Sequence, residues 1–244
     1  MVIKKSFNAV NKVFIFVIFY YLLFLSSAIF SAINRVLKFS LSMLMLLLGL
    51  ELITIMTQYG VMGAISKVTA GEGVTLKSWI EGIKSSFFRY LGAIIVLGIF
   101  YLILLVIFVT STYLMFSGMK GMAVNEIIET VPFNFAVSLS IVMLTIFSIY
   151  IIPFVFVKNK GADAVIDGIK YLFKNFKNSI VLIVMGIVKT FLYIYLLLFA
   201  SNYSHYSFQY NAITSLNSFI SIYIDLIVFA GACYILRDEL ACPA

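Results

Sequence analysis

The sequence predicts an all-α, polytopic integral membrane protein with six transmembrane helices in a single domain that covers residues 1–244. The composition is the first reason. The chain is 63% hydrophobic and only 11% charged, whereas soluble domains carry about 45–50% apolar and about 25% charged residues. The second reason is the recurrence of apolar stretches long enough to cross a bilayer, which takes about 20 residues. No polar segment between these stretches is long enough to fold separately, so one domain is expected.

The six apolar stretches place the spans at about residues 13–33, 39–66, 90–116, 133–157, 179–200 and 213–236. The first stretch follows Lys4 and Lys5, as the apolar region of a signal peptide would. It is longer than the roughly 7–15 residues of such a region, so we expect an uncleaved first span. Pro153 is expected to kink the fourth span near its cytoplasmic end, an interruption that membrane helices tolerate.

Basic residues predict the orientation. With the N-terminus in the cytoplasm, thirteen Lys and Arg residues fall on the inner side of the spans, and only Arg35, Lys38 and Lys120 fall on the outer side. Cytoplasmic loops of membrane proteins carry such an excess of positive charge. The bias therefore predicts a multi-pass protein of the cell membrane with both termini in the cytoplasm.

Two cytoplasmic segments repeat each other. Residues 80–84 read Ile-Glu-Gly-Ile-Lys and residues 166–170 read Ile-Asp-Gly-Ile-Lys, and each segment runs directly into a span. Apolar and charged side chains separate on helical faces in both, which predicts short amphipathic interfacial helices at about 74–89 and 162–178. Residues 5–12 form a looser copy, which is the first of three in chain order. The predicted unit is an interfacial helix, an outward span and a returning span, used three times.

The polar faces of the interfacial helices are basic. Such faces attract anionic lipids, so the partners expected first are the membrane lipids of the anionic inner leaflet. The net charge of +7 gathers beside spans, which suits a membrane surface rather than nucleic acid. These lysines and arginines either anchor the protein or recognise a specific headgroup or partner. The candidate headgroup-binding residues are Lys77, Lys84, Arg89, Lys170, Lys174 and Lys177.

The repeated segments and the six-span layout resemble a poorly characterised group of prokaryotic membrane proteins related to the membrane domain of some glycerophosphoryl diester phosphodiesterases. The catalytic part of those phosphodiesterases is a separate soluble domain, and no segment of this chain is long enough to form one. The resemblance therefore implies the architecture alone, and no activity or functional residue is carried over.

Three ionisable residues interrupt the predicted spans: Glu51, Lys189 and Asp225. At about 1.5 Å of rise per residue they lie roughly 15–18 Å into a hydrocarbon layer about 30 Å thick. All three therefore fall near the midplane of the bilayer. The fifth and sixth spans are consecutive and antiparallel, so Lys189 and Asp225 are able to meet, and Glu51 is the surplus acid.

Charges inside a membrane are costly and often mark a pathway, which predicts a polar site formed by these three residues. On this reading the protein is a non-enzymatic component that handles or transports a polar or lipid-like substrate, such as a transporter or a transporter-associated subunit. The alternative is an assembly or immunity factor that uses the same charges to pair helices. A protein partner or a homo-oligomer could also pair with Glu51 or Lys189.

Other chemistry has little support in the sequence. It has no phosphate-binding glycine loop followed by Lys and Ser or Thr, no His-Glu-x-x-His pair and no Gly-x-Ser-x-Gly turn. The single His and the two Cys give no metal-ligand cluster. We therefore expect no catalytic residue, no metal site and no cofactor.

Overall fold

The computed structural model describes residues 2–37, 41–115, 131–200, 202–203 and 208–241, which form helices and short turns without a strand among them. The predicted all-α class is confirmed. The segments around Lys38 and Lys120 lie outside the described residues. The helices are α1 (Val2–Lys12), α2 (Phe14–Leu37), α3 (Leu41–Thr69), α4 (Leu76–Met115), α6 (Val131–Ser148), α7 (Ile151–Val157), α8 (Ala164–Lys174), α9 (Phe176–Ala200) and α10 (Phe208–Ala241).

Among the described residues, five stretches are long and apolar enough to cross a membrane: α3, α4, the run from α6 into α7, α9 and α10. A sixth is added when α1 and α2 are taken as one span bent by 72°. Each of the six predicted spans thus has a helical counterpart, and the multi-pass architecture is confirmed.

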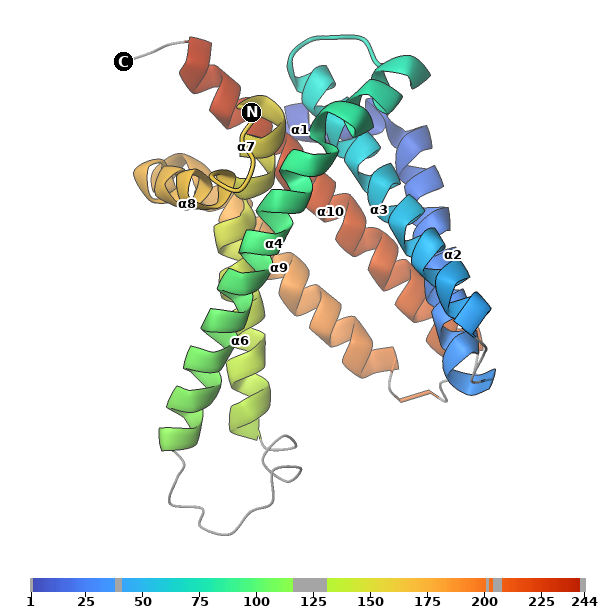
Figure 1. The fold of residues 1–244 in the computed structure, drawn as a ribbon. Coiled ribbons are helices and arrows are strands. Elements are labelled where there is room, and N and C mark those ends of the chain that lie inside the picture. The colour runs from blue at the N-terminus through green and yellow to red at the C-terminus, as the bar shows by residue number, and fades with distance from the viewer. Residues whose placement is uncertain (1, 38–40, 116–130, 201, 204–207, 242–244) are drawn as a thin grey trace.

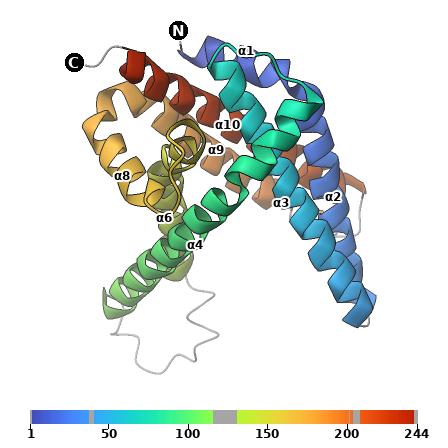
Figure 2. The ribbon, with the colours of Figure 1, turned by 45° about the horizontal axis from the view of Figure 1, so that its top comes forward.

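The helices converge at one end of the molecule and spread apart towards the other (Figures 1 and 2). The convergent end carries α1, α7, α8, the start of α4 and the end of α10. It also carries most of the loop lysines and arginines, and we call it the basic end. Towards the opposite, far end, α4 and α6 form one arm, and α2 and α3 form another.

The threefold repeat appears in the packing at the basic end. The glycine of the second copy, Gly82 in α4, faces Gly63 of α3, where an added methyl group would lie 3.3 Å from the Gly82 Cα. The glycine of the third copy, Gly168 in α8, packs still closer on α7, where a methyl group would lie 2.9 Å from the backbone of Ile151. The start of α4 therefore packs on α3, the returning span of the first unit. Likewise, α8 packs on α7, which is part of the returning span of the second unit.

The first copy closes this arrangement into a ring. Helix α1 packs against α10, the returning span of the last unit. Ser6 of α1 is fully buried there, and its hydroxyl oxygen would lie 3.2 Å from a methyl group added to Gly231. Small residues let helix backbones approach closely in membranes, and here they join all three units.

The structure differs from the prediction in the first interfacial segment. Residues 76–89 are not a separate helix but the first turns of the 40-residue helix α4. No proline lies between Leu76 and Met115, so the backbone hydrogen bonding continues into the span. The second predicted segment does form a separate helix: α8 ends at Lys174, and α9 begins after Asn175.

Candidate functional site

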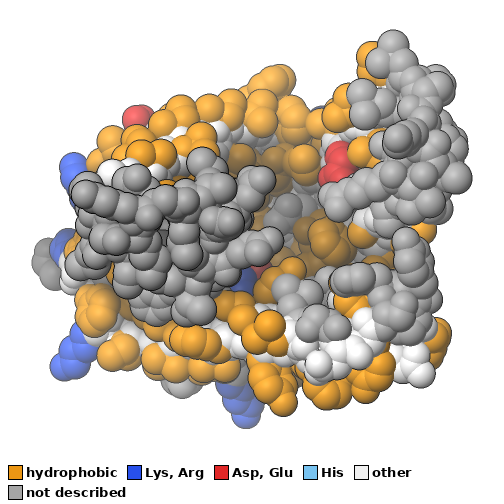
Figure 3. Space-filling model, turned by 90° about the horizontal axis from the view of Figure 1, so that it is seen from below, with side chains coloured by type: hydrophobic (Ala, Val, Ile, Leu, Met, Phe, Trp, Pro, Cys, Tyr) orange, Lys and Arg blue, Asp and Glu red, His pale blue; other side chains and the backbone are white. Residues whose placement is uncertain are grey.

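A cavity of about 280 Å³ lies where the two arms separate. Helices α3, α4, α6, α7, α9 and α10 all contribute to its wall, so residues from the three units of the repeat meet there. Figure 3 shows the far-end face hollowed at its centre and bordered by hydrophobic side chains. The lining residues are Gln58, Met62, Tyr90, Ile94, Leu97, Leu144, Thr145, Ser148, Ile149, Ile152, Pro153, Gly186, Lys189, Asp225, Val228 and Phe229.

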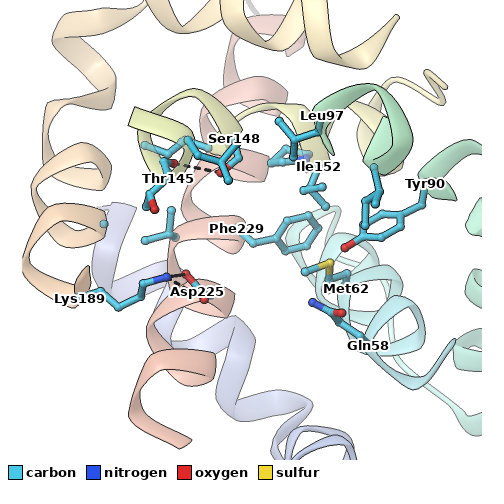
Figure 4. Close-up of a pocket in the computed structure, with 16 residues that line it drawn as sticks. Gln58, Met62, Tyr90, Leu97, Thr145, Ser148, Ile152, Lys189, Asp225 and Phe229 are labelled. Carbon is cyan, nitrogen blue, oxygen red and sulfur yellow. Dashed lines mark hydrogen bonds and ion pairs between the residues drawn. The ribbon is translucent and has the colours of Figure 1, made fainter. Parts of the chain in front are cut away.

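An ion pair forms one side of the cavity (Figure 4). Lys189 Nζ of α9 donates to both carboxylate oxygens of Asp225 on α10, at 2.8 Å to Oδ1 and 3.1 Å to Oδ2. The contact that depth along the spans predicted is therefore present. The Lys189 side chain is 16% exposed and the Asp225 side chain 50% exposed, so the carboxylate is the more accessible member of the pair.

The local sequence positions both charges. Gly186 lies three residues before Lys189, and the absence of a side chain brings α9 close to α6, where a methyl group would lie 3.2 Å from Thr145 Cγ2. Farther along α9, the Asn217 amide of α10 donates to the Tyr193 carbonyl at 3.1 Å. These contacts hold α9 beside both α6 and α10 and keep Lys189 at the cavity.

The cavity wall includes a break in the fourth span. Helix α6 ends at Ser148, and α7 begins at Ile151. Pro153 has no N–H to donate to the carbonyl of Ile149, four residues earlier, and this interrupts the hydrogen bonding at the expected position. Ser148, Ile149, Ile152 and Pro153 all line the cavity. Interrupted backbone at membrane depth is tolerated where it is buried in protein or lines a water-filled cavity.

Uncharged polar groups complete the lining, and the sequence analysis did not identify them as site residues. They are Gln58, Tyr90, Thr145 and Ser148. The hydroxyls of Thr145 and Ser148 donate to backbone carbonyls at 2.9 and 3.0 Å, so their oxygens remain acceptors. Two features of the sequence could have indicated these lining residues. Gln58 is an amide side chain inside a predicted span, and Ser148 lies close to Pro153.

The structure does not bring Glu51 into this site. Its carboxylate accepts a hydrogen bond of 2.5 Å from the Ser27 hydroxyl of α2, and Glu51 is not among the cavity lining. Of the three residues of the predicted polar site, Lys189 and Asp225 therefore line the cavity and Glu51 does not. The Ser27 to Glu51 contact instead joins α2 to α3, as interhelical polar contacts do in membranes.

The predicted headgroup-binding residues differ in their contacts. Arg89 donates to Asn159 Oδ1 at 2.5 Å, and Lys174 forms an ion pair of 3.6 Å with Glu239. Both therefore join elements of the basic end to each other. The other four members of the set are exposed: Lys77, Lys84, Lys170 and Lys177.

Across the part of the chain that the structure describes, no three His, Cys, Asp or Glu side chains come together as metal ligands would. Comparison with protein-family models, with curated proteins and with solved structures finds no match for the chain. The resemblance to six-span prokaryotic membrane proteins therefore stays a prediction.

Proposed function

We propose that this protein is a non-enzymatic membrane component that handles or transports a polar or lipid-like substrate, as a transporter or a transporter-associated subunit. Lys189 and Asp225 are its central polar site. The observation that carries the proposal is that this ion pair lines a cavity and that half of the Asp225 side chain is exposed. Ionisable residues within membrane spans usually face a pathway or a water-filled cavity.

The broken fourth span supports the same proposal. Transporters commonly build substrate sites near the midplane from discontinuous helices at the interface between internal repeats. Here the break between α6 and α7 lines the cavity, and residues from all three units surround it. The alternative, an assembly or immunity factor that pairs helices through charges, is favoured by the Ser27 to Glu51 contact.

Water access to the cavity tests the proposal. Ser148→Cys adds a thiol of similar size to the lining, and Leu102→Cys adds one to an exposed position of α4 outside the cavity. Both would be made with Cys233 and Cys242 replaced by Ala. A membrane-impermeant thiosulfonate requires a hydrated thiolate, so we expect it to modify Ser148→Cys and to spare Leu102→Cys. Equal resistance at the two positions would favour the helix-pairing alternative.

We propose further that the basic end faces the cytoplasm, because cytoplasmic loops carry the excess of Lys and Arg. Ser85 and Asn202 are both exposed, at opposite ends of the predicted spans. In intact cells an impermeant reagent should modify Asn202→Cys and leave Ser85→Cys unmodified. The reverse pattern would overturn this orientation.

A further inference from the structure

We propose that the cavity binds a small zwitterion, a molecule that carries both an ammonium group and an anionic group and has no net charge. The proposal rests on the proposed function, because it names the substrate class of the same site. The ammonium group contacts Asp225, and the anionic group contacts Lys189.

The ion pair leaves part of its hydrogen-bonding capacity unused. A lysine ammonium has three N–H donors, and a carboxylate accepts at about four lone-pair positions. The contacts between Lys189 and Asp225 use one lone pair on each carboxylate oxygen and at most two of the lysine donors. Lys189 thus retains a donor for an anionic oxygen, and Asp225 retains acceptors for a cation.

Charge balance in the cavity also favours a zwitterion. Lys189 and Asp225 together carry no net charge, so a ligand with a single charge would leave that charge unbalanced in a low-dielectric region, which is costly. A zwitterion places each of its charges beside the opposite one and keeps the sum at zero. An entirely uncharged ligand would leave the spare donor and acceptors of the pair unused.

Aromatic side chains form part of the cavity lining. Phe229 lies four residues after Asp225 on α10, one helical turn away on the same face. Tyr90 lines the cavity from α4, and Figure 4 shows both rings among the lining side chains. Aromatic faces attract ammonium groups, with quaternary ammonium ligands as a well-established example. A carboxylate with a ring one turn away favours a cation beside the middle of α10.

The size and the remaining lining limit the ligand. A cavity of about 280 Å³ lies just below the roughly 300–1,000 Å³ of sites for drug-sized molecules. It therefore suits a compact zwitterionic group. The apolar lining residues, such as Met62, Ile94 and Leu97, would contact an attached hydrocarbon chain. The same chemistry could come from a free solute or from a lipid headgroup.

Protection of a cavity thiol tests the proposal and separates the two sources. The full-length Ser148→Cys protein, lacking Cys233 and Cys242, would be placed in nanodiscs of phosphatidylglycerol, which is anionic. The rate of thiosulfonate labelling would then be measured against three probes. These are glycerophosphocholine as a free zwitterion, lysophosphatidylcholine as a zwitterion with a chain, and lysophosphatidylglycerol as an anion with the same chain.

We expect a zwitterionic probe to slow labelling in a saturable manner, and lysophosphatidylglycerol to have no such effect. Protection by glycerophosphocholine would identify the headgroup as sufficient, whereas protection by lysophosphatidylcholine alone would identify a lipid. In the same background, Asp225→Asn should weaken the apparent affinity about tenfold or more, because a charge-assisted contact is lost. Glu51→Gln removes the other membrane acid, which lies outside the cavity lining, and should leave the affinity unchanged.

Each other result overturns the inference. Labelling that no zwitterion slows would reject the ligand class while leaving the water-accessible site, and hence the proposed function, in place. Absence of labelling at Ser148→Cys would reject both. If Asp225→Asn lowers the yield of folded protein, the double variant Lys189→Gln with Asp225→Asn removes both charges and should show the same loss of affinity. Protection retained in that variant would show that the ion pair does not bind the probe.

Discussion

The basic end and the far end of the molecule are built from the same helices but pack differently. Apolar burial in α3 begins at Tyr59 and continues to Val68, in its second half, whereas Leu46, Leu48 and Leu52 in the first half are exposed. Helix α4 runs the other way: its buried apolar residues, Tyr90 and Ala93, lie in its first half, where Phe88 is nevertheless exposed, and several apolar residues of its second half are exposed. In both helices the buried half is the one at the basic end.

This difference in packing assigns stability of the fold mainly to the basic end and places the proposed binding site at its edge. The close glycine contacts and most fully buried side chains lie at the basic end, so that end supplies the packed core. The far halves of the helices expose apolar side chains, as lipid-facing surfaces do. The cavity with Lys189 and Asp225 lies at the border, where the packing gives way to open space. Part of the cavity lining, such as Met62, Tyr90 and Phe229, comes from this packed core.

The largest expected effect tests the packed core directly. Leu172 of α8 is 1% exposed at the basic end, and Leu102 of α4 is 59% exposed in the far half. Leu172→Ala should lower the free energy of unfolding by about 2–5 kcal/mol, since it leaves a cavity. Leu102→Ala should change it by less than about 0.5 kcal/mol, as expected at exposed positions. Unfolding in mixed detergent micelles would measure both, and equal losses would refute the division between the two ends.

The ion pair at the border should give the next largest effect. Lys189→Met or Asp225→Leu alone leaves one charge uncompensated and should cost more than the double change does. Because half of the Asp225 side chain is exposed, the cost should be below the roughly 3–5 kcal/mol of a fully buried pair. A double-mutant cycle on the free energy of unfolding measures the coupling. Additive losses would show that the contact contributes nothing to stability. A folded double variant without ligand protection at the cavity would place the role of the pair in function.

Two glycines, one at the basic end and one in the far half of α4, should give a smaller difference in stability. A methyl group at Gly168 would lie 2.9 Å from the backbone of Ile151, whereas a methyl group at Gly98 in the far half of α4 would meet nothing within 4 Å. Gly168→Ala should therefore cost about 1–3 kcal/mol through overpacking. Gly98→Ala should be neutral or stabilise by up to about 1 kcal/mol, because Ala favours a helix. Thermal unfolding of the two variants would measure the difference, and a tolerated Gly168→Ala would contradict the close contact of α8 and α7.

The sequence predicts depth in the membrane better than it predicts direction around a helix. Lys189 and Asp225 were paired correctly because position along consecutive antiparallel spans is enough to bring them to one level. Glu51 lies at a similar predicted depth, but its partner is Ser27. The apolar residues of α3 are distributed over all faces of the helix, so no periodic pattern indicated which way Glu51 points. Pro153 predicted the break in the fourth span for a local reason, the missing N–H.

The cavity itself was beyond the sequence because it depends on six helices meeting. Gln58, Tyr90 and Ser148 come from three different spans, and no spacing relates them. The continuity of α4 was also missed, since an amphipathic pattern followed by an apolar one predicts two helices only where a residue interrupts the backbone. In the third unit Asn175 is such an interruption, between α8 and α9, and no equivalent one occurs in α4.

The smallest effect concerns the exposed charges of the basic end. Lys170 and Lys177 are exposed, whereas Lys174 is paired with Glu239. Each exposed lysine should attract anionic lipid by about 1 kcal/mol near the membrane surface. Replacing Lys170 and Lys177 with Gln should thus reduce the enrichment of phosphatidylglycerol around the full-length protein in mixed nanodiscs, measured by native mass spectrometry. The effect should fade with added salt, since exposed charges are screened.

A matched control separates attraction to lipid from stabilisation of the fold. Lys174→Gln removes one positive charge from the same segment, at the end of α8, but breaks the ion pair to Glu239, an exposed contact worth at most about 1 kcal/mol. It should lower the free energy of unfolding slightly and change lipid enrichment less than the double replacement does. Equal enrichment in all variants at low salt would mean that Lys170, Lys174 and Lys177 do not select anionic lipid. The contribution of this segment would then be the Lys174 to Glu239 contact, which joins α8 to α10.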